Sequence, residues 1–219
     1  MKISLRENIK TSWKQFKQNY KFLVPLFRLV VVVSALLNIE GDNMFSLSGI
    51  ISLFISPLIY FAVANSSLKV SRNEKVGFSN LFKGLTQKKY FLFLAINIFV
   101  SFAMMVLFGI SALGIVFVKI NPIISIAFSV ALIALVFVTC IGVMFFPQYR
   151  LIDVGGGFWS TIKGSFALAK GRRAFLVKFA ILAILLNILG AILVGIGLLV
   201  SLPLTSITLA NIYDKIKSN

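Results

Sequence analysis

The side chains that could perform acid–base chemistry are few and lie far apart in the chain. The sequence contains no histidine, which removes the commonest general base and the usual partner of a nucleophilic serine. Its six carboxylates fall in connections between apolar runs or at the ends of these runs: Glu7, Glu40, Asp42, Glu74, Asp153 and Asp214. No pair is placed for general acid and base work or for a proton relay inside a membrane. We therefore expect a protein that is not an enzyme, has no catalytic residue and is not an ion-coupled pump.

Metal and cofactor motifs are absent from the sequence as well. The single cysteine, Cys140, lies within an apolar run, where it is typical of a small buried hydrophobe. No HExxH or Asp-rich metal motif occurs. Gly155-Gly156-Gly157 is not followed by the Lys-Ser or Lys-Thr of a nucleotide loop, so we interpret it as a flexible linker. We expect no cofactor and no metal ion.

Three polar residues inside apolar runs are candidates for intramembrane polar contacts: Arg28, Asn97 and Asn187. Arg28 could be a buried functional charge, or it could extend its side chain to the cytoplasmic surface, because it lies near that end of its run. The two asparagines could hydrogen-bond across helices or line a polar pocket.

The composition requires lipid as the solvent of the chain. Of the 219 residues, 59% are hydrophobic and only 13% are charged, with a mean hydropathy of +0.99. A soluble core of this size could not bury so many apolar side chains. The net charge of +16 does not indicate nucleic acid, because the cations are confined to short segments between apolar runs. The segment Met1–Lys21 is polar and basic throughout, so we expect it to stay with the mature chain rather than to be a cleaved signal peptide.

Apolar runs of about the length that a bilayer requires predict six transmembrane helices in three hairpins. The predicted spans are Phe22–Ile39, Leu47–Val70, Phe91–Val118, Ile123–Phe146, Ala174–Leu189 and Leu198–Tyr213. Polar turns at Glu40–Asn43 and Lys119–Pro122 join the first two pairs, and glycines at 190, 195 and 197 mark a tight hairpin or close helix contact in the third. The prediction is an all-α integral membrane protein with a single domain.

Basic amphipathic segments precede the hairpins. Ile9, Trp13, Phe16 and Tyr20 have helical spacing, and lysines follow one position behind them. This pattern is typical of a helix lying in the headgroup region of an anionic leaflet, although a soluble helix docked on a partner fits almost as well. The residues predicted to contact lipid headgroups are Lys10, Lys14, Lys17, Lys21, Lys83, Lys88, Lys89, Lys163, Lys170, Arg172 and Arg173.

The distribution of Lys and Arg predicts the orientation in the membrane. Nearly all of them fall in the N-terminal segment, the second and fourth connections and the tail, whereas Lys119 alone lies in a turn on the opposite side. The positive-inside rule therefore predicts cytoplasmic N- and C-termini.

The chain carries an internal repeat, with units of about 1–70, 71–150 and 151–219. Segments in the first and third units align without a gap, and the ends of the first and third hairpins align at a different offset. The aligned pairs are Ile9/Ile162, Lys10/Lys163, Ser12/Ser165, Trp13/Phe166, Lys17/Lys170, Phe22/Phe175 and Leu23/Leu176, then Pro57/Pro203, Ala64/Ala210, Asn65/Asn211 and Lys69/Lys215. Such recurrence predicts pseudo-threefold symmetry about the membrane normal, the alternative being chance similarity of apolar sequence.

The region from Phe146 to Ile216 resembles the C-terminal half of a broad group of uncharacterised bacterial six-helix membrane proteins. These are related to the membrane domain that accompanies some glycerophosphodiester phosphodiesterases. The resemblance rests on a Ser-containing basic helix, a Gly-x-Gly hairpin turn, a following Pro and a late Tyr, and also on FSNLFKGL at Phe78–Leu85. The residues in those places are Ser165, Gly195, Gly197, Pro203 and Tyr213. The resemblance implies a six-helix membrane fold in a bacterial inner membrane. Because the phosphodiesterase domain is not present in this sequence, no activity is carried over.

These observations favour a non-enzymatic membrane protein that is a scaffold or accessory subunit and binds anionic lipid through its basic interfacial helices. Its expected partners are anionic lipids and a membrane protein or a second copy of the chain, not nucleic acid. Two alternatives remain open: a small-molecule or lipid transporter, and an immunity protein against a membrane-active peptide.

Overall fold

The computed structural model describes residues 4–37, 47–116, 126–131, 141, 145–192 and 196–218, and no strand occurs among them. The predicted all-α class is confirmed for this part of the chain. The helices are α1 (Leu5–Leu37), α2 (Leu47–Ser71), the 3₁₀ helix η1 (Phe78–Asn80), α3 (Gln87–Val116), α5 (Pro147–Asp153), α6 (Phe158–Ala169), α7 (Arg173–Ile192) and α8 (Leu198–Lys217).

Three of these helices are long and apolar enough to cross a bilayer. Their apolar stretches are Leu5–Leu36, Ile51–Ser71 and Arg173–Ile192, which overlap the first and second predicted spans and include the fifth. The predicted turns at Glu40–Asn43 and Lys119–Pro122, Cys140, Gly195 and most of the predicted fourth span lie outside the described residues.

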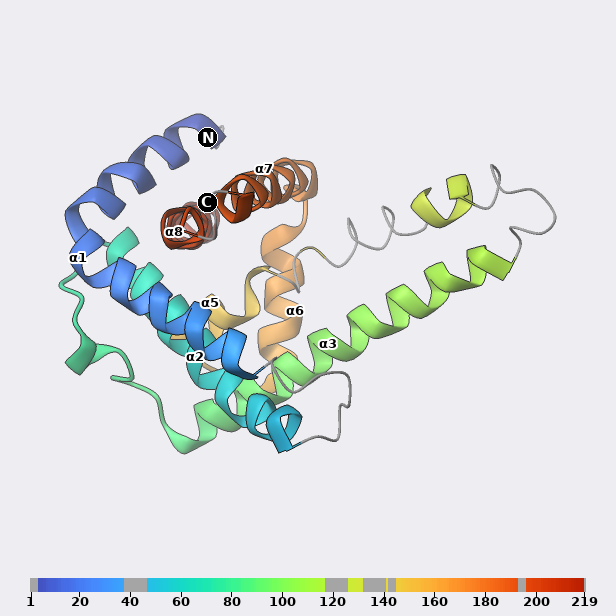
Figure 1. The fold of residues 1–219 in the computed structure, drawn as a ribbon, viewed down its shortest axis with the longest axis horizontal. Coiled ribbons are helices and arrows are strands. Elements are labelled where there is room, and N and C mark those ends of the chain that lie inside the picture. The colour runs from blue at the N-terminus through green and yellow to red at the C-terminus, as the bar shows by residue number, and fades with distance from the viewer. Residues whose placement is uncertain are drawn as a thin grey trace.

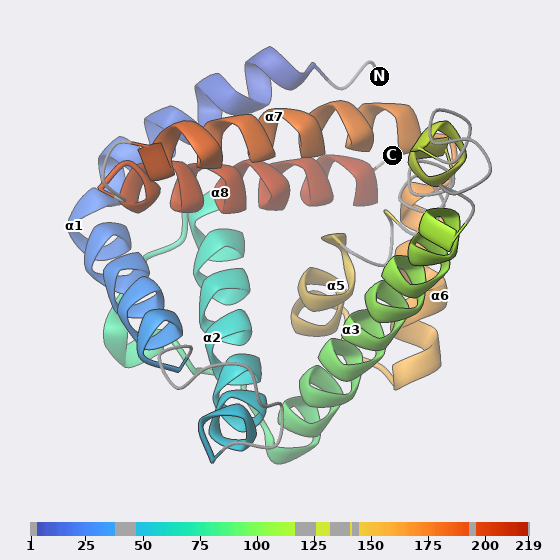
Figure 2. The same ribbon diagram turned by 45° about the vertical axis from the view of Figure 1, so that its right-hand side comes forward.

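Helix α1 differs from the prediction of a surface helix followed by a separate span. It is one helix from Leu5 to Leu37, although it changes direction about halfway along (Figures 1 and 2). Pro25 lies inside this helix rather than in the first turn of a new one. It has no N–H to donate to the carbonyl of Lys21, so the helix can bend there without ending. The two predicted elements are therefore the two halves of α1, and at about 1.5 Å per residue the whole helix is longer than a bilayer requires.

The second basic segment, from Val76 to Tyr90, is not an amphipathic helix. It forms η1 and turns before α3 begins at Gln87. In contrast, Pro147–Arg150 belongs to the short helix α5, in which Pro147 occupies a first-turn position. Of the three basic segments predicted to be amphipathic helices, only the third, which forms α6, is a separate helix of this kind.

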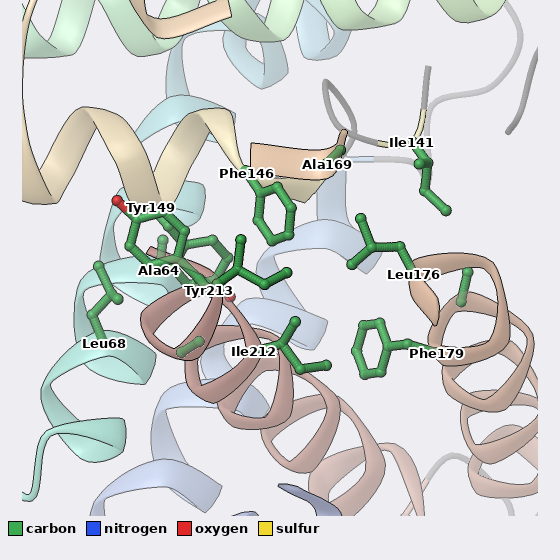
Figure 3. Packing of buried hydrophobic residues seen from close by; sticks show 13 residues of the cluster. Ala64, Leu68, Ile141, Phe146, Tyr149, Ala169, Leu176, Phe179, Ile212 and Tyr213 are labelled. Atoms are coloured by element: carbon green, nitrogen blue, oxygen red, sulfur yellow. The ribbon is translucent and has the colours of Figure 1, made fainter. Parts of the chain in front are cut away.

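Helix α8 lies at the centre and packs against α1, α2 and α7. Its residues Ile207, Ala210, Ile212 and Tyr213 are fully buried. Figure 3 shows Tyr213 beside Tyr149 of α5, between α8 and Leu68 of α2, and their rings stack with centroids 5.8 Å apart. The main apolar core therefore joins α2, α5, α6 and α7 around the C-terminal half of α8.

The helices are arranged along three sides of a triangle in Figure 2. Helices α7 and α8 lie along the top, the second half of α1 lies with α2 along the left, and α3 lies along the right. The α7–α8 pair closes tightly, because a Cβ added to Gly190 would lie 2.9 Å from the backbone carbonyl carbon of Gly197. The predicted close contact between these glycines is confirmed.

Candidate functional site: a basic aromatic surface and a buried polar network

The first half of α1 packs a polar face against the rest of the protein. Asn8, Ser12 and Gln15 are buried, at 0%, 0% and 4% exposure. Of the four residues that form the apolar face, Phe16 alone is buried, whereas Trp13 and Tyr20 are 42% and 50% exposed and Ile9 is half-buried. The burial of the polar face was not predicted from the sequence.

Asn211 of α8 explains why Ser12 and Gln15 are buried. Its Nδ2 donates to Ser12 Oγ at 2.9 Å and to Gln15 Oε1 at 2.8 Å. Gln15 Nε2 in turn donates to the carbonyl of Ser71 at 3.0 Å, which joins α1 to the end of α2. Because Ser12 and Gln15 have these partners, burying them costs far less than burying unpaired polar groups.

A network of charges continues from the same end of α2. Arg72 Nη2 lies 2.6 Å from Asp214 Oδ1 and 3.0 Å from Asp153 Oδ1, so one guanidinium joins the ends of α5 and α8. Lys217 Nζ lies 2.7 Å from Asp153 Oδ2, and the Tyr213 hydroxyl donates to the same oxygen at 3.0 Å. Sequence reasoning missed this network, since its members are far apart in the chain and have no common motif.

The surroundings of Asp153 favour its charged form. Partial burial raises the pKa of this carboxyl, but the hydrogen bonds from Lys217 and Tyr213 and the charge of Arg72 lower it more, so the pKa lies below its usual value. The hydrogen bond to Asp214 is the main reason why the pKa of Arg72 is raised. The cluster is therefore a set of ion pairs that hold helix ends together.

These contacts bring the basic segments of the chain to one end of the structure. The N-terminal segment contributes Gln15, the connection after α2 contributes Arg72, the connection before α6 contributes Asp153, and the tail contributes Asp214. The segments that the sequence assigned to one membrane side are thus in mutual contact.

The exposed face of the first half of α1 carries cations beside aromatic rings. Lys10, Lys14, Lys17 and Lys21 are all exposed. Lys17 Nζ lies 5.9 Å from the centroid of the Trp13 ring, within range of a cation–π interaction. The result is a surface of lysines, tryptophan and tyrosine on a helix whose opposite face is fixed by α8.

Helix α6 has a second surface of this kind. Trp159 and Phe166 are 63% and 37% exposed, and Lys163 and Lys170 are exposed beside them. Its buried face again includes a serine, because the Ser165 hydroxyl donates to the carbonyl of Thr161 at 2.8 Å, as Ser12 donates to Asn8 at 2.8 Å. Arg172 and Arg173, at the start of α7, are half-buried.

The middle segment places the remaining predicted headgroup lysines on loops and at the start of α3. Lys83 and Lys88 are exposed and Lys89 is half-buried, near Phe78 and Phe82, which are 54% and 49% exposed. Helix α2 holds this segment: Asn65 Nδ2 donates to the carbonyl of Leu81 at 2.7 Å.

The three residues predicted to make intramembrane polar contacts have different surroundings in the structure. Arg28 is exposed on α1, as the snorkelling alternative requires. Asn97 is half-buried and donates to the carbonyl of Phe93 in its own helix at 2.8 Å. The side-chain oxygen of Asn187 is buried without a partner among the described residues. Asn65 and Asn211, which the sequence singled out only as repeat markers, are the asparagines that bond between segments.

The fold and the exposed side chains together define a class of protein: a helical protein that has three candidate membrane spans and basic aromatic surfaces. No protein-family model, curated protein or solved structure matches the chain.

Proposed function

We propose that the chain is a non-enzymatic multi-pass membrane protein that binds anionic lipid headgroups through its basic aromatic surfaces and is a scaffold or accessory subunit for another membrane process. The proposal places it in a bacterial inner membrane, with both termini in the cytoplasm. Its six spans would be those expected from the apolar runs, three of which coincide with long apolar helices of the structure.

The observation that carries this proposal is the orientation of α1. Its polar face is buried and hydrogen-bonded to α8 through Ser12 and Gln15, which leaves Trp13, Tyr20 and four lysines exposed together. Tryptophan and tyrosine are enriched at membrane–water interfaces, and each Lys near an anionic surface contributes about 1 kcal/mol of attraction. This surface is directly continuous with an apolar candidate span in the same helix.

The pattern of burial supports a repeated unit. Asn8, Ser12, Phe16 and Leu23 are buried, and so are the residues aligned with them in the third unit. The end of α2 matches the end of α8 in the same way, with the buried pairs Pro57/Pro203, Phe61/Ile207, Ala64/Ala210, Asn65/Asn211 and Val70/Ile216. The three sides of the triangle in Figure 2 are consistent with pseudo-threefold symmetry.

The positions of the carboxylates support a role without catalysis. Asp153 and Asp214, which lie close together, both form ion pairs with Arg72. Both carboxylates are therefore engaged in ion pairs that hold helix ends together.

The chain contains two natural probes for a test, since its only tryptophans, Trp13 and Trp159, lie on the two basic surfaces. Single-tryptophan proteins, W13F and W159F, would be reconstituted into vesicles that contain phosphatidylcholine and phosphatidylglycerol, of which only one carries brominated acyl chains. We expect brominated phosphatidylglycerol to quench each tryptophan more strongly than brominated phosphatidylcholine at equal mole fraction.

A charge variant supplies the matched control. Replacing Lys10, Lys14, Lys17 and Lys21 with Gln in the W159F protein should remove the preference for phosphatidylglycerol at Trp13. The same four changes in the W13F protein should leave the preference at Trp159. Equal quenching by both lipids in the unmodified surfaces would refute the lipid-binding role.

The accessory role has its own test. Native mass spectrometry of the protein extracted in mild detergent should show a second protein in fixed stoichiometry. A lone chain that keeps one class of small metabolite would instead support the transporter alternative.

A further inference from the structure

A hollow of about 540 Å³ lies where α6 ends and α7 begins. It is open to the surface and lined by Phe166, Ala167, Lys170, Gly171, Arg173 and Ala174. Its walls therefore combine apolar side chains with two cations, the combination found where a lipid glycerol and phosphate meet a protein.

The two cations of this hollow, Lys170 and Arg173, form no ion pair with the described carboxylates. The ion pairs among the described residues are formed by Arg72 and Lys217. Lys178 is exposed on α7 one turn after Ala174. Side chains on a helix lean toward its N-terminus, so Lys178 adds a third positive charge on the side of the hollow.

The backbone at this corner adds donors. Gly171 has a φ of +75°, a conformation that a residue with a side chain rarely adopts, and this allows α7 to start directly after α6. The first N–H groups of α7 have no acceptor within their own helix, and such groups favour an anion. They supplement the side-chain charges at the same place.

An exposed apolar stripe continues from the hollow along α7. Following Ala174 and Lys178 at helical spacing are Ile181, Leu185, Ile188 and Ile192, which are 53%, 53%, 51% and 71% exposed. Helix α7 is one of the three candidate membrane spans. The stripe therefore offers a path for a hydrocarbon chain that begins at a cationic hollow.

We infer that this corner is a binding site for a single anionic glycerophospholipid, with its phosphate at Lys170 and Arg173 and an acyl chain along the α7 stripe. The inference rests on the proposed membrane location and adds to it a discrete, stoichiometric site. General attraction of the basic surfaces to an anionic leaflet requires no such site.

The test is native mass spectrometry of the full-length protein in detergent, titrated with phosphatidylglycerol or phosphatidylcholine. The unmodified protein should bind one phosphatidylglycerol first, at concentrations at which phosphatidylcholine does not bind. In the double variant K170Q/R173Q, the affinity for this first lipid should fall about tenfold or more, because two cations near the phosphate are lost. The matched control R6Q/K75Q removes the same charge from exposed positions outside both the hollow and the basic surfaces, and should change the affinity less than threefold.

Two further measurements test whether the shape of the hollow contributes to binding and whether its ligand is a lipid or a soluble phosphate. The variant A174F places an aromatic ring in the hollow without changing the charge. It should lower the affinity for the first phosphatidylglycerol as K170Q/R173Q does, and the thermal unfolding midpoint should stay unchanged. Glycerol phosphate in excess should not displace the lipid, because it has no chain to lie on the stripe. Displacement would assign the hollow to a soluble phosphate and overturn the lipid site.

The outcomes distinguish this site from the general role. If both double variants weaken binding equally, or if A174F has no effect, the discrete site is wrong, while the preference of Trp13 for brominated phosphatidylglycerol can still hold. If that preference is absent and phosphatidylglycerol binds no better than phosphatidylcholine, the proposed function and the site both fail.

Discussion

The Asn211 side chain joins the first and last described helices of the chain. Its amide nitrogen donates to two side chains of α1, and Gln15 continues the connection to α2. A single residue therefore fixes which face of α1 is buried and, as a consequence, which face carries the exposed lysines and aromatic rings.

Replacing Asn211 with Ala should lower the free energy of unfolding by about 1–3 kcal/mol, because Gln15 and Ser12 lose a partner while they stay buried. Unfolding by an increasing fraction of SDS in mixed micelles measures this change. N97A is the matched control, since the Asn97 amide donates to a carbonyl of its own helix. If N97A lowers the free energy of unfolding as much as N211A does, the interhelical hydrogen bonds of Asn211 are not the source of the stability.

The charge network predicts a loss of stability in acid. The pKa of Asp153 is lower in the folded protein than its ordinary value, so the ionised form favours folding. This contribution is fully present above about pH 4, the ordinary range of an aspartate, and is lost as the pH falls through the folded pKa. The unfolding midpoint of the purified protein, followed from pH 7 to pH 3, should therefore fall at the acid end.

The variant D153N tests whether Asp153 causes the predicted loss of stability in acid. It should unfold at a lower temperature than the unmodified protein at pH 7, and its midpoint should depend less on pH below pH 4. E74Q, at an exposed carboxylate, is the control and should keep the full dependence. An unchanged acid transition in D153N would mean that other carboxylates cause it.

At the scale of the helix, the α7–α8 pair depends on two glycines that bring backbones into contact. A Cβ on Gly190 would lie 2.6 Å from Ser201 Oγ and 2.9 Å from the carbonyl carbon of Gly197. Both distances are too short for a real Cβ, and one of the atoms is backbone, which cannot easily move away. The pair can therefore close only if this position has no side chain.

G190A should lower the free energy of unfolding by about 1–3 kcal/mol, because the added methyl group overpacks the contact. G109A is the control in α3, where a Cβ meets nothing within 4 Å, and there the change should be neutral or stabilise by up to about 1 kcal/mol through helix propensity. The two variants would be compared by the same SDS titration. Equal effects would show that α7 and α8 do not need this approach.

The helices themselves could largely be predicted, but their faces could not. Apolar runs predict α2, α7 and α8 to within a few residues, because lipid-compatible length and composition are local properties of the sequence. The buried face of α1 was missed, since Asn8, Ser12 and Gln15 recur with the same helical spacing as Ile9, Trp13, Phe16 and Tyr20. Which of two such faces is buried depends on Asn211, nearly two hundred positions away.

At the scale of the whole molecule, the contacts among Gln15, Ser71, Arg72, Asp153 and Asp214 place four basic segments at one end. The proposed orientation puts this end in the cytoplasm, where anionic lipid and positive loops attract one another. The turn between α7 and α8 would then lie on the other side of the membrane.

Cysteine labelling in intact cells tests this orientation. In a background in which Cys140 is replaced by Ser, I196C should react with a membrane-impermeant maleimide, because Ile196 is 71% exposed near the start of α8. W159C, at an equally accessible position on α6, should react only after the cells are opened. The reverse pattern would invert the topology.

The central position of α8 also has a consequence for biosynthesis. The ribosome completes this helix after every other described helix, yet α1, α2 and α7 all pack against it. Until Asn211 emerges, Ser12 and Gln15 of α1 lack their hydrogen-bond partner on α8. The packing of α1, α2 and α7 can therefore be completed only after α8 has been synthesised.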